Sequence, residues 1–278
     1  MSERAIGIFD SGVGGLTVFK EVRRLLSGEQ LIYLGDTARV PYGTKSPRTV
    51  LRYSLEAAAF LDRQRVKLLV VACNTASAVA LDELEERFSL PVVGVIEPGA
   101  RRAAAVTRNR RVGVIGTEGT IKSGAYTRAI HALDPGIEVH AVACPLFVPL
   151  TEEGWAEHPV ARLVASEYLA PLLERDIDTL VLGCTHYPLL KSTLHQVLGE
   201  GIELVDSAEQ TALRVSELLT GRGLCRRTPP DPSMLFVTDV PTRFERVGGS
   251  FLGAPLRDVM QVELDDTLPP ATDARTAG

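Results

Sequence analysis

Two cysteines, Cys73 and Cys184, stand at equivalent places in two similar segments of the chain. Each ends a short apolar run and is followed by polar residues, which are Asn74, Thr75, Thr185 and His186. An apolar run that changes into such residues predicts a buried strand that passes into a helix. Ligands of parallel sheets bind at the carboxyl ends of the strands. Both thiols are therefore predicted to face a ligand.

Two thiols on opposite sides of one ligand can invert a carbon centre. One thiolate removes a proton from one face, and the other thiol delivers a proton to the opposite face, so each is a base in one direction and an acid in the other. The N–H groups and partial positive charge of a helix N-terminus favour a thiolate and attract a carboxylate. Because an amino-acid carbanion is poorly stabilised, fixed donors and a cleft without water are also required.

Polar residues elsewhere in the sequence suit the same task. Asp10 and Ser11 end the first apolar run, just before a glycine-rich turn. We expect Asp10 to orient Cys73 or to accept its proton, and Ser11 to hold the substrate. We expect His186 to play the corresponding part toward Cys184.

Strands and helices must alternate to position these residues. Several apolar runs are continuous Val, Ile and Leu, which is typical of parallel strands buried on both faces. Strand–helix alternation predicts a doubly wound α/β architecture. The predicted strands cover residues 5–9, 31–34, 68–71, 92–95, 112–115, 138–143, 179–182, 203–205 and 234–237. Helices are predicted over residues 47–65, 75–88, 160–174 and 208–219.

Weak internal similarity indicates two related halves. Residues 68–75 resemble residues 179–186, and residues 6–12 resemble residues 112–118. Buried strand–helix units all look alike, so the repeat alone decides little. We expect two pseudo-symmetric α/β domains, each a mostly parallel sheet flanked by helices. The predicted limits are 1–96 plus 207–266 for the first domain, 97–206 for the second, and 267–278 for a disordered tail without an apolar pattern.

Composition excludes several classes of function. The 278 residues are 45% hydrophobic and 23% charged, as in soluble globular proteins, and the net charge of −5 argues against a nucleic-acid partner. No run reaches the roughly 18–20 apolar residues of a membrane span. The N-terminal residues lack a signal-peptide pattern, and four scattered cysteines do not form a disulfide framework. We expect a reduced, cytoplasmic protein.

One local charge cluster is an exception to the acidic balance. A nucleic-acid patch is possible there, but no aromatic residues interleave with the charges, so a solvated helix end and turn is favoured. Its members are Arg101, Arg102, Arg108, Arg110 and Arg111.

The motifs around these residues resemble the glutamate racemases, bacterial enzymes that make D-glutamate for peptidoglycan. The resemblance rests on residues 9–17, 40–45, 71–77 and 182–188, and extends to residues 147–153 and 236–239. It spans about residues 5–253, and the joint occurrence of both cysteine motifs is highly specific. It implies two α/β domains with the active site in the cleft between them. It also implies no cofactor, no metal, glutamate as substrate and a homodimer.

The resemblance also implies roles for individual residues. Cys73 is implied as the base toward D-glutamate and Cys184 as the base toward L-glutamate. Asp10, Glu152 and His186 are implied to assist the thiols. The residues implied to bind substrate are Asp10, Ser11, Tyr42, Gly43, Asn74, Thr75, Thr117, Thr120, Thr185 and His186.

A nicotinamide-dependent enzyme is an alternative of another class. The turn at Gly12, with Asp36 at the end of the next strand, imitates a dinucleotide-binding fingerprint. However, Thr17 replaces the third glycine, and Asp10 would place a second negative charge against the pyrophosphate. We therefore disfavour nicotinamide binding.

Three further alternatives remain. A thiol redox protein is disfavoured because the sequence has no Cys-x-x-Cys, and a periplasmic-type binding module because no export signal is seen. An aspartate racemase or dicarboxylate isomerase is the nearest competitor.

We expect the other cysteines, Cys144 and Cys225, to be small core residues. We expect the other histidines to be structural or solvated, namely His131, His140, His158 and His195.

Overall fold

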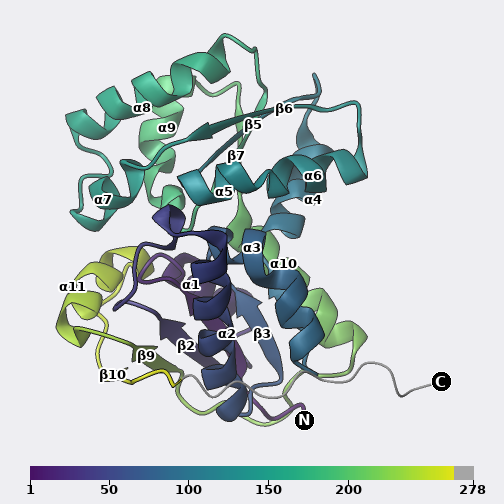
Figure 1. Cartoon of the computed structure of the whole chain (residues 1–278), viewed down its shortest axis with the longest axis vertical. Helices are drawn as coiled ribbons and strands as arrows, with labels where there is room; N and C mark the ends of the chain where they lie inside the picture. The colour runs from purple at the N-terminus through teal and green to yellow at the C-terminus, as the bar shows by residue number, and fades with distance from the viewer. Residues whose placement is uncertain (266–278) are drawn as a thin grey trace.

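Two parallel β-sheets form the frame of the computed structural model, which describes residues 1–265 (Figure 1). The first sheet has the order β10-β9-β2-β1-β3-β4 and the second the order β6-β5-β7-β8. The first sheet contains β1 (Ile6–Asp10), β2 (Leu31–Gly35), β3 (Leu68–Val71), β4 (Val92–Gly94), β9 (Met234–Val237) and β10 (Val259–Gln261). The second contains β5 (Arg111–Gly116), β6 (Glu138–Ala143), β7 (Thr179–Gly183) and β8 (Glu203–Asp206).

The two sheets repeat one arrangement. The order β2-β1-β3-β4 of the first sheet corresponds strand by strand to β6-β5-β7-β8 of the second. Phe9 pairs with Val71, and Ile115 pairs with Leu182. Each cysteine of interest follows its paired strand residue by two positions, so the tertiary structure confirms the predicted pseudo-symmetric α/β class. Sequence patterns missed β10, which is short and largely exposed.

Helices cover both sheets and connect their strands (Figure 1). Those of the first sheet are α1 (Leu16–Leu25), α2 (Pro47–Arg63), α3 (Asn74–Arg87) and α11 (Pro241–Leu252). Those between β4 and β9 are α4 (Ile96–Val106), α5 (Glu118–Ser123), α6 (Ala125–Leu133), α7 (Phe147–Glu152), α8 (Pro159–Leu173), α9 (Lys191–Leu198) and α10 (Ser207–Gly221). Two 3₁₀ turns, η1 (Tyr42–Thr44) and η2 (Tyr187–Leu190), lie near the cysteines. The four predicted helices are present, with ends displaced by at most two residues.

Local sequence explains where α2 begins. The Ser46 hydroxyl accepts a hydrogen bond from the Thr49 N–H, and Pro47 occupies the first helical position. The cap satisfies a backbone donor that the helix leaves unpaired, and the proline ring presets the helical φ angle.

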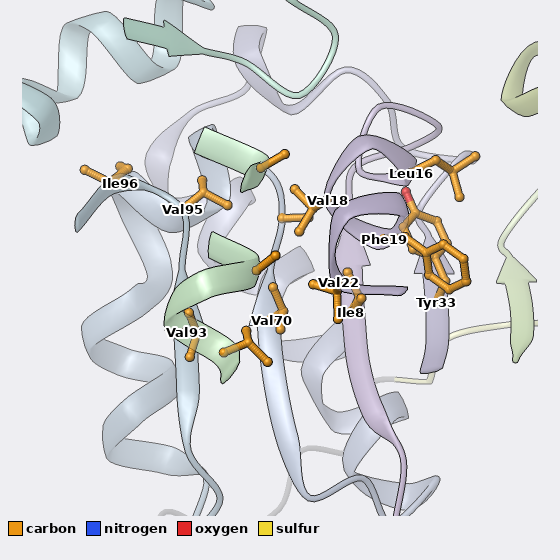
Figure 2. Close-up of a cluster of buried hydrophobic side chains, with 14 of the residues drawn as sticks. Ile8, Leu16, Val18, Phe19, Val22, Tyr33, Val70, Val93, Val95 and Ile96 are labelled. Atoms are coloured by element: carbon orange, nitrogen blue, oxygen red, sulfur yellow. The ribbon is translucent and has the colours of Figure 1, made fainter. Parts of the chain in front are cut away.

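A shared apolar core joins the two halves. One cluster of buried side chains contains Val18 of α1 and Val70 of β3 together with Val114 of β5 and Val181 of β7. Figure 2 shows the part of this cluster under α1, where Val18 and Val22 lie beside Ile8 and Val70. Because this core is continuous, it fixes how the two sheets face each other.

The chain crosses between the sheets twice. It leaves the first sheet through α4 and returns through α10, so the first sheet is built from two separate stretches. The residue limits of the two domains stay a prediction, and residues 267–278, predicted as a tail, lie outside the described residues. Within residues 1–265, no helix is long and apolar enough to cross a membrane.

Two predictions about side chains outside the site have different outcomes. Cys144 is buried, as expected, but the prediction that Cys225 is a core residue is wrong because Cys225 is exposed. It lies in the irregular connection that follows α10. In the arginine cluster, Arg101 and Arg102 form ion pairs with acidic side chains and are exposed, as the solvated interpretation expects.

Candidate active site

Cys73 and Cys184 line one pocket between the two halves of the molecule. The pocket walls come from Ser11, Val40, Pro41, Tyr42, Gly43, Cys73, Asn74, Thr75, Thr117, Val148, Cys184, Thr185 and His186. Ten of these residues were predicted from the sequence. Three other predicted residues, Asp10, Thr120 and Glu152, are not in the lining. They lie behind it, in contact with residues that are.

The Cys73 thiol stands at the N-terminus of α3, where Cys73 is the N-cap residue. Burial raises its pKa to about 11, and the neighbouring Asp10 carboxylate raises it too. Hydrogen bonds from the Ala76 N–H, the Ser11 hydroxyl and the Thr75 N–H act in the opposite direction. The helix terminus thus partly offsets the cost of burying a thiolate. With a pKa of about 11, the Cys73 thiol keeps its proton at neutral pH.

Asp10 ends β1 directly behind Cys73 and is fully buried. Its Oδ2 accepts a hydrogen bond of 2.9 Å from the Gly12 N–H, while Oδ1 has no partner within residues 1–265. Burial raises the pKa of this carboxyl, whereas a positive charge on His186 lowers it. A buried carboxyl with a raised pKa can take up a proton, which is the part predicted for it.

Cys184 has a different local structure from Cys73. An α-helix was expected directly after it, but the 3₁₀ turn η2 follows instead, and α9 begins only at Lys191. Pro188 has no N–H, so it cannot donate to the Cys184 carbonyl, and the Tyr187 N–H does so at 3.1 Å. Burial raises the pKa of Cys184 well above its ordinary value, and the His186 N–H is the backbone donor that opposes this shift.

An imidazole and a carboxylate stand behind Cys184. The His186 Nδ1 atom lies 3.9 Å from the Cys184 sulfur, and its Nε2 atom lies 3.1 Å from Oε1 of Glu152. Burial would raise the pKa of Glu152, but the hydrogen bond and charge of His186 and the charge of Arg243 hold it below its ordinary value. An ionised Glu152 can stabilise a protonated His186. The three side chains form a path along which a proton can leave or reach the thiol.

Three threonine hydroxyls connect the halves at one side of the pocket. Oγ1 of Thr75, on α3, lies 2.9 Å from that of Thr117 and 3.1 Å from that of Thr120, which belong to the second half. The backbone of Gly43 fits closely against Thr117, since a Cβ at Gly43 would lie only 2.5 Å from the Cβ of Thr117. Only glycine allows this approach.

The segment that carries Tyr42 is held from behind by Asp36. The buried Asp36 carboxylate accepts hydrogen bonds from the Tyr42 hydroxyl, the Arg39 guanidinium and the Thr238 hydroxyl. These bonds occupy Asp36, which the dinucleotide alternative requires to be free for a ribose. Sequence reasoning missed this positioning role because Asp36 and its partners are far apart in the chain or lie in an irregular loop.

Sequence reasoning also missed Tyr126 and Thr17. The Tyr126 hydroxyl donates to Oδ1 of Asn74 at 2.7 Å, and the Thr17 hydroxyl donates to the Thr185 carbonyl at 3.1 Å. Both bonds connect one half of the molecule to the other. Both residues lie on ordinary amphipathic helices, so no local signal distinguishes them from core residues.

The chemistry of the site follows from this geometry. Two thiols enter one pocket from two halves, and each has a group behind it that can exchange a proton. Hydroxyl and amide groups, together with the N-terminus of α3, are suited to bind carboxylates. The arrangement can therefore move a proton between two faces of a small acid.

Known proteins share this fold and sequence. Residues 6–214 match the Asp/Glu/Hydantoin racemase family. A glutamate racemase of Geobacter metallireducens is 62% identical over 266 residues, which cover 95% of this chain and 98% of that protein. A glutamate racemase of Syntrophus aciditrophicus is 54% identical, over 93% of this chain and 96% of that protein.

Solved structures agree with these sequence matches. A glutamate racemase isoform from Bacillus anthracis has a TM-score of 0.92 and 42% identity, covering 95% of this chain and 99% of that one. The glutamate racemase of Francisella tularensis, solved in complex with D-glutamate, has a TM-score of 0.91 and 40% identity, covering 96% and 100%. The chain therefore belongs to the Asp/Glu/Hydantoin racemase family, and within that family to the glutamate racemases.

Proposed function

We propose that the protein interconverts L-glutamate and D-glutamate by moving the Cα proton between Cys73 and Cys184, and thereby supplies D-glutamate for peptidoglycan. The observation that carries this proposal is that the two thiols line one pocket from opposite halves. The identity with glutamate racemases over nearly the whole chain supports glutamate as the substrate.

The proposed reaction begins with one thiolate and one thiol. The Cys73 thiolate takes the Cα proton of D-glutamate, and the Cys184 thiol gives its proton to the opposite face, which yields L-glutamate, a Cys73 thiol and a Cys184 thiolate. The reverse reaction starts from that state. Asp10 behind Cys73, and His186 with Glu152 behind Cys184, would return the thiols to their starting protonation states.

Burial of the two cysteines disfavours the thiolate that the proposed reaction needs. Burial raises the pKa of both thiols, so a thiolate is scarce unless a nearby positive charge stabilises it. The substrate ammonium brings a positive charge into the pocket, which stabilises a thiolate there. We propose that the pocket-lining residues predicted from the sequence hold the two carboxylates and the ammonium. The reaction then needs only side chains of this protein and no cofactor.

We also propose that the protein acts in the cytoplasm as a homodimer, which the motif resemblance supports. Multi-angle light scattering of the purified protein tests the dimer. A mass of one chain at micromolar concentration would contradict it.

Proton NMR in D₂O with purified protein and no added cofactor tests the main proposal. We expect the Cα proton signal of L-glutamate to disappear while a chiral assay detects D-glutamate. Exchange of L-aspartate but not of L-glutamate would assign the site to the other acid. Dependence on added nicotinamide, pyridoxal phosphate or a metal ion would refute the mechanism with two thiols alone.

A further inference from the structure

A tyrosine outside the pocket lining contacts the segments of both thiols. Tyr126, on α6 of the second half, is 3% exposed. Its hydroxyl lies 2.7 Å from Oδ1 of Asn74, the residue directly after Cys73. Its ring packs against Gly183, the residue directly before Cys184, where a Cβ would lie 3.0 Å from the ring. One side chain thus connects the two places where the chemistry is proposed to occur.

We propose that Tyr126 is a positioning residue that orients the Asn74 amide so that its nitrogen donates to a carboxylate of the bound amino acid. This inference rests on the proposed function, since it requires an anionic substrate. It concerns binding and not proton transfer, because Tyr126 does not line the pocket.

The unpaired end of the Asn74 amide supports this orientation. A side-chain amide has an acceptor oxygen at one end and two N–H donors at the other. Asn74 is 2% exposed, lines the pocket, and its Nδ2 atom is buried without a hydrogen-bond partner within residues 1–265. A buried donor without a partner is costly unless a ligand satisfies it. A carboxylate oxygen in the pocket would do so.

Tyr126 can orient the Asn74 amide only if its hydroxyl stays protonated and its ring is held in a fixed position. Burial raises the pKa of Tyr126 above its ordinary range, so the hydroxyl retains a proton to donate at neutral pH. Gly99 and Gly183 leave room for the ring, since a Cβ at either residue would lie within 3.3 Å of it. If the amide turned over, its oxygen would face the substrate carboxylate and repel it. The Tyr126 bond holds the amide against this rotation.

Tyr126→Phe tests the inference, because it removes the hydroxyl and keeps the ring. We expect KM for glutamate to rise about tenfold, the effect of losing about one hydrogen bond, with kcat changed less than about threefold. Loss of an interaction present in both ground and transition states appears in KM. The melting temperature is expected to fall by about 2–4 °C for each kcal/mol lost with this buried hydrogen bond, while the protein stays folded at the assay temperature. Tyr168→Phe, which removes a hydroxyl that accepts a hydrogen bond from the Leu146 N–H away from the pocket, is the control and should leave KM unchanged.

A double mutant distinguishes positioning from packing. Asn74→Ala alone should raise KM above the wild-type value. Adding Tyr126→Phe to the Asn74→Ala variant should change KM by less than about twofold, since Tyr126 acts on the substrate through Asn74. An unchanged KM in Tyr126→Phe, or additive effects in the double mutant, would overturn the inference about Tyr126. If the wild-type protein still racemised glutamate in that experiment, the proposed function would stand. Absence of wild-type turnover would instead refute the proposed function and this inference with it.

Discussion

The segments around Cys73 and Cys184 have the same backbone position and different surroundings. Each cysteine follows the third strand of its four-strand repeat, and each is 6% exposed. Cys73 caps the long helix α3 and has the Asp10 carboxylate behind it. Cys184 precedes a 3₁₀ turn and has an imidazole behind it, with Glu152 beyond. Burial raises the pKa of both thiols, but less for Cys73.

The repeat determines where the thiols lie, but the groups next to them differ. In the proposed mechanism each thiol would therefore exchange its proton with a different kind of group. The residue of β5 that corresponds to Asp10 of β1 is Gly116, so the second half has no carboxylate at that place. The side chain next to Cys184 is instead the His186 imidazole, in the turn after the strand. We infer that racemisation does not require the same acid–base group next to each thiol. It requires that both thiols can approach the Cα atom of the substrate.

The largest expected effect comes from removing either thiol. Cys73→Ser and Cys184→Ser should each lower racemisation by about 10²–10⁴-fold, because a serine hydroxyl is a far weaker base than a thiolate. Both variants should fold, since the side chains have similar volume. Chiral chromatography of glutamate measures the rate, and circular dichroism checks the fold. Cys225→Ser, at an exposed site outside the pocket, is the control and should retain full activity. Full turnover in either thiol variant would contradict the mechanism.

The supporting groups should come next in size. Asp10→Asn and His186→Asn should each lower kcat/KM by about 10²-fold, if each serves its own thiol as acid or base. Since the two enantiomers are equally stable, kcat/KM must fall equally in both directions. The asymmetry should instead appear with Cα-deuterated substrate: Asp10→Asn should enlarge the isotope effect for D-glutamate, and His186→Asn for L-glutamate. The same isotope effects for both variants would show that the two groups are not specific to one thiol.

Asp10→Asn should also stabilise the fold while it lowers activity. Burial raises the pKa of Asp10 in the folded state, so its contribution to stability is greatest below the unfolded pKa of about 4 and is lost as pH rises. An asparagine carries no charge to bury and still accepts from the Gly12 N–H. Calorimetry at pH 7 should show a melting temperature higher by about 2–4 °C for each kcal/mol gained. A lower melting temperature would mean that the charge is well solvated in the fold.

A moderate effect is expected from pH. Because burial raises the pKa of Cys73 to about 11, the fraction of free enzyme with a thiolate rises with pH. Between pH 6 and 9, kcat/KM should therefore increase, by at most about tenfold per unit. Initial rates at low substrate concentration measure this. A flat profile would show that the thiol proton passes to a group inside the site and not to solvent.

The smallest effect should come from the outer end of the Cys184 path. Arg243 reaches Glu152 from the first half at 3.4 Å, but its side chain is 62% exposed. Since exposed ion pairs contribute little, Arg243→Ala should change kcat/KM by less than about threefold. Glu152→Gln, which also breaks the contact with His186, should cost more. Equal effects of the two changes would mean that Glu152 acts through Arg243 and not through His186.

Local sequence determined most of the fold and the place of the chemistry. Runs made mostly of apolar residues mark β1, β3, β5 and β7, because strands buried on both faces carry few polar residues. Each cysteine lies at the end of such a run, so its position at the ligand-binding edge follows from its place in the chain. The prediction of a helix directly after Cys184 was wrong, because the pattern of a strand, a cysteine and polar residues does not account for the missing N–H of Pro188.

Contacts between distant segments were decided only by the tertiary structure. The Tyr126–Asn74 and Thr17–Thr185 hydrogen bonds join segments of different halves, and hydrophobic periodicity says only that such residues are buried. The lining by Val40 and Val148 likewise depends on how the halves face each other. The pKa shifts of the two thiols are also decided by the tertiary structure, because desolvation depends on all the atoms that surround a group. Residue types and spacing thus determined which groups can do the chemistry, and packing decided their partners.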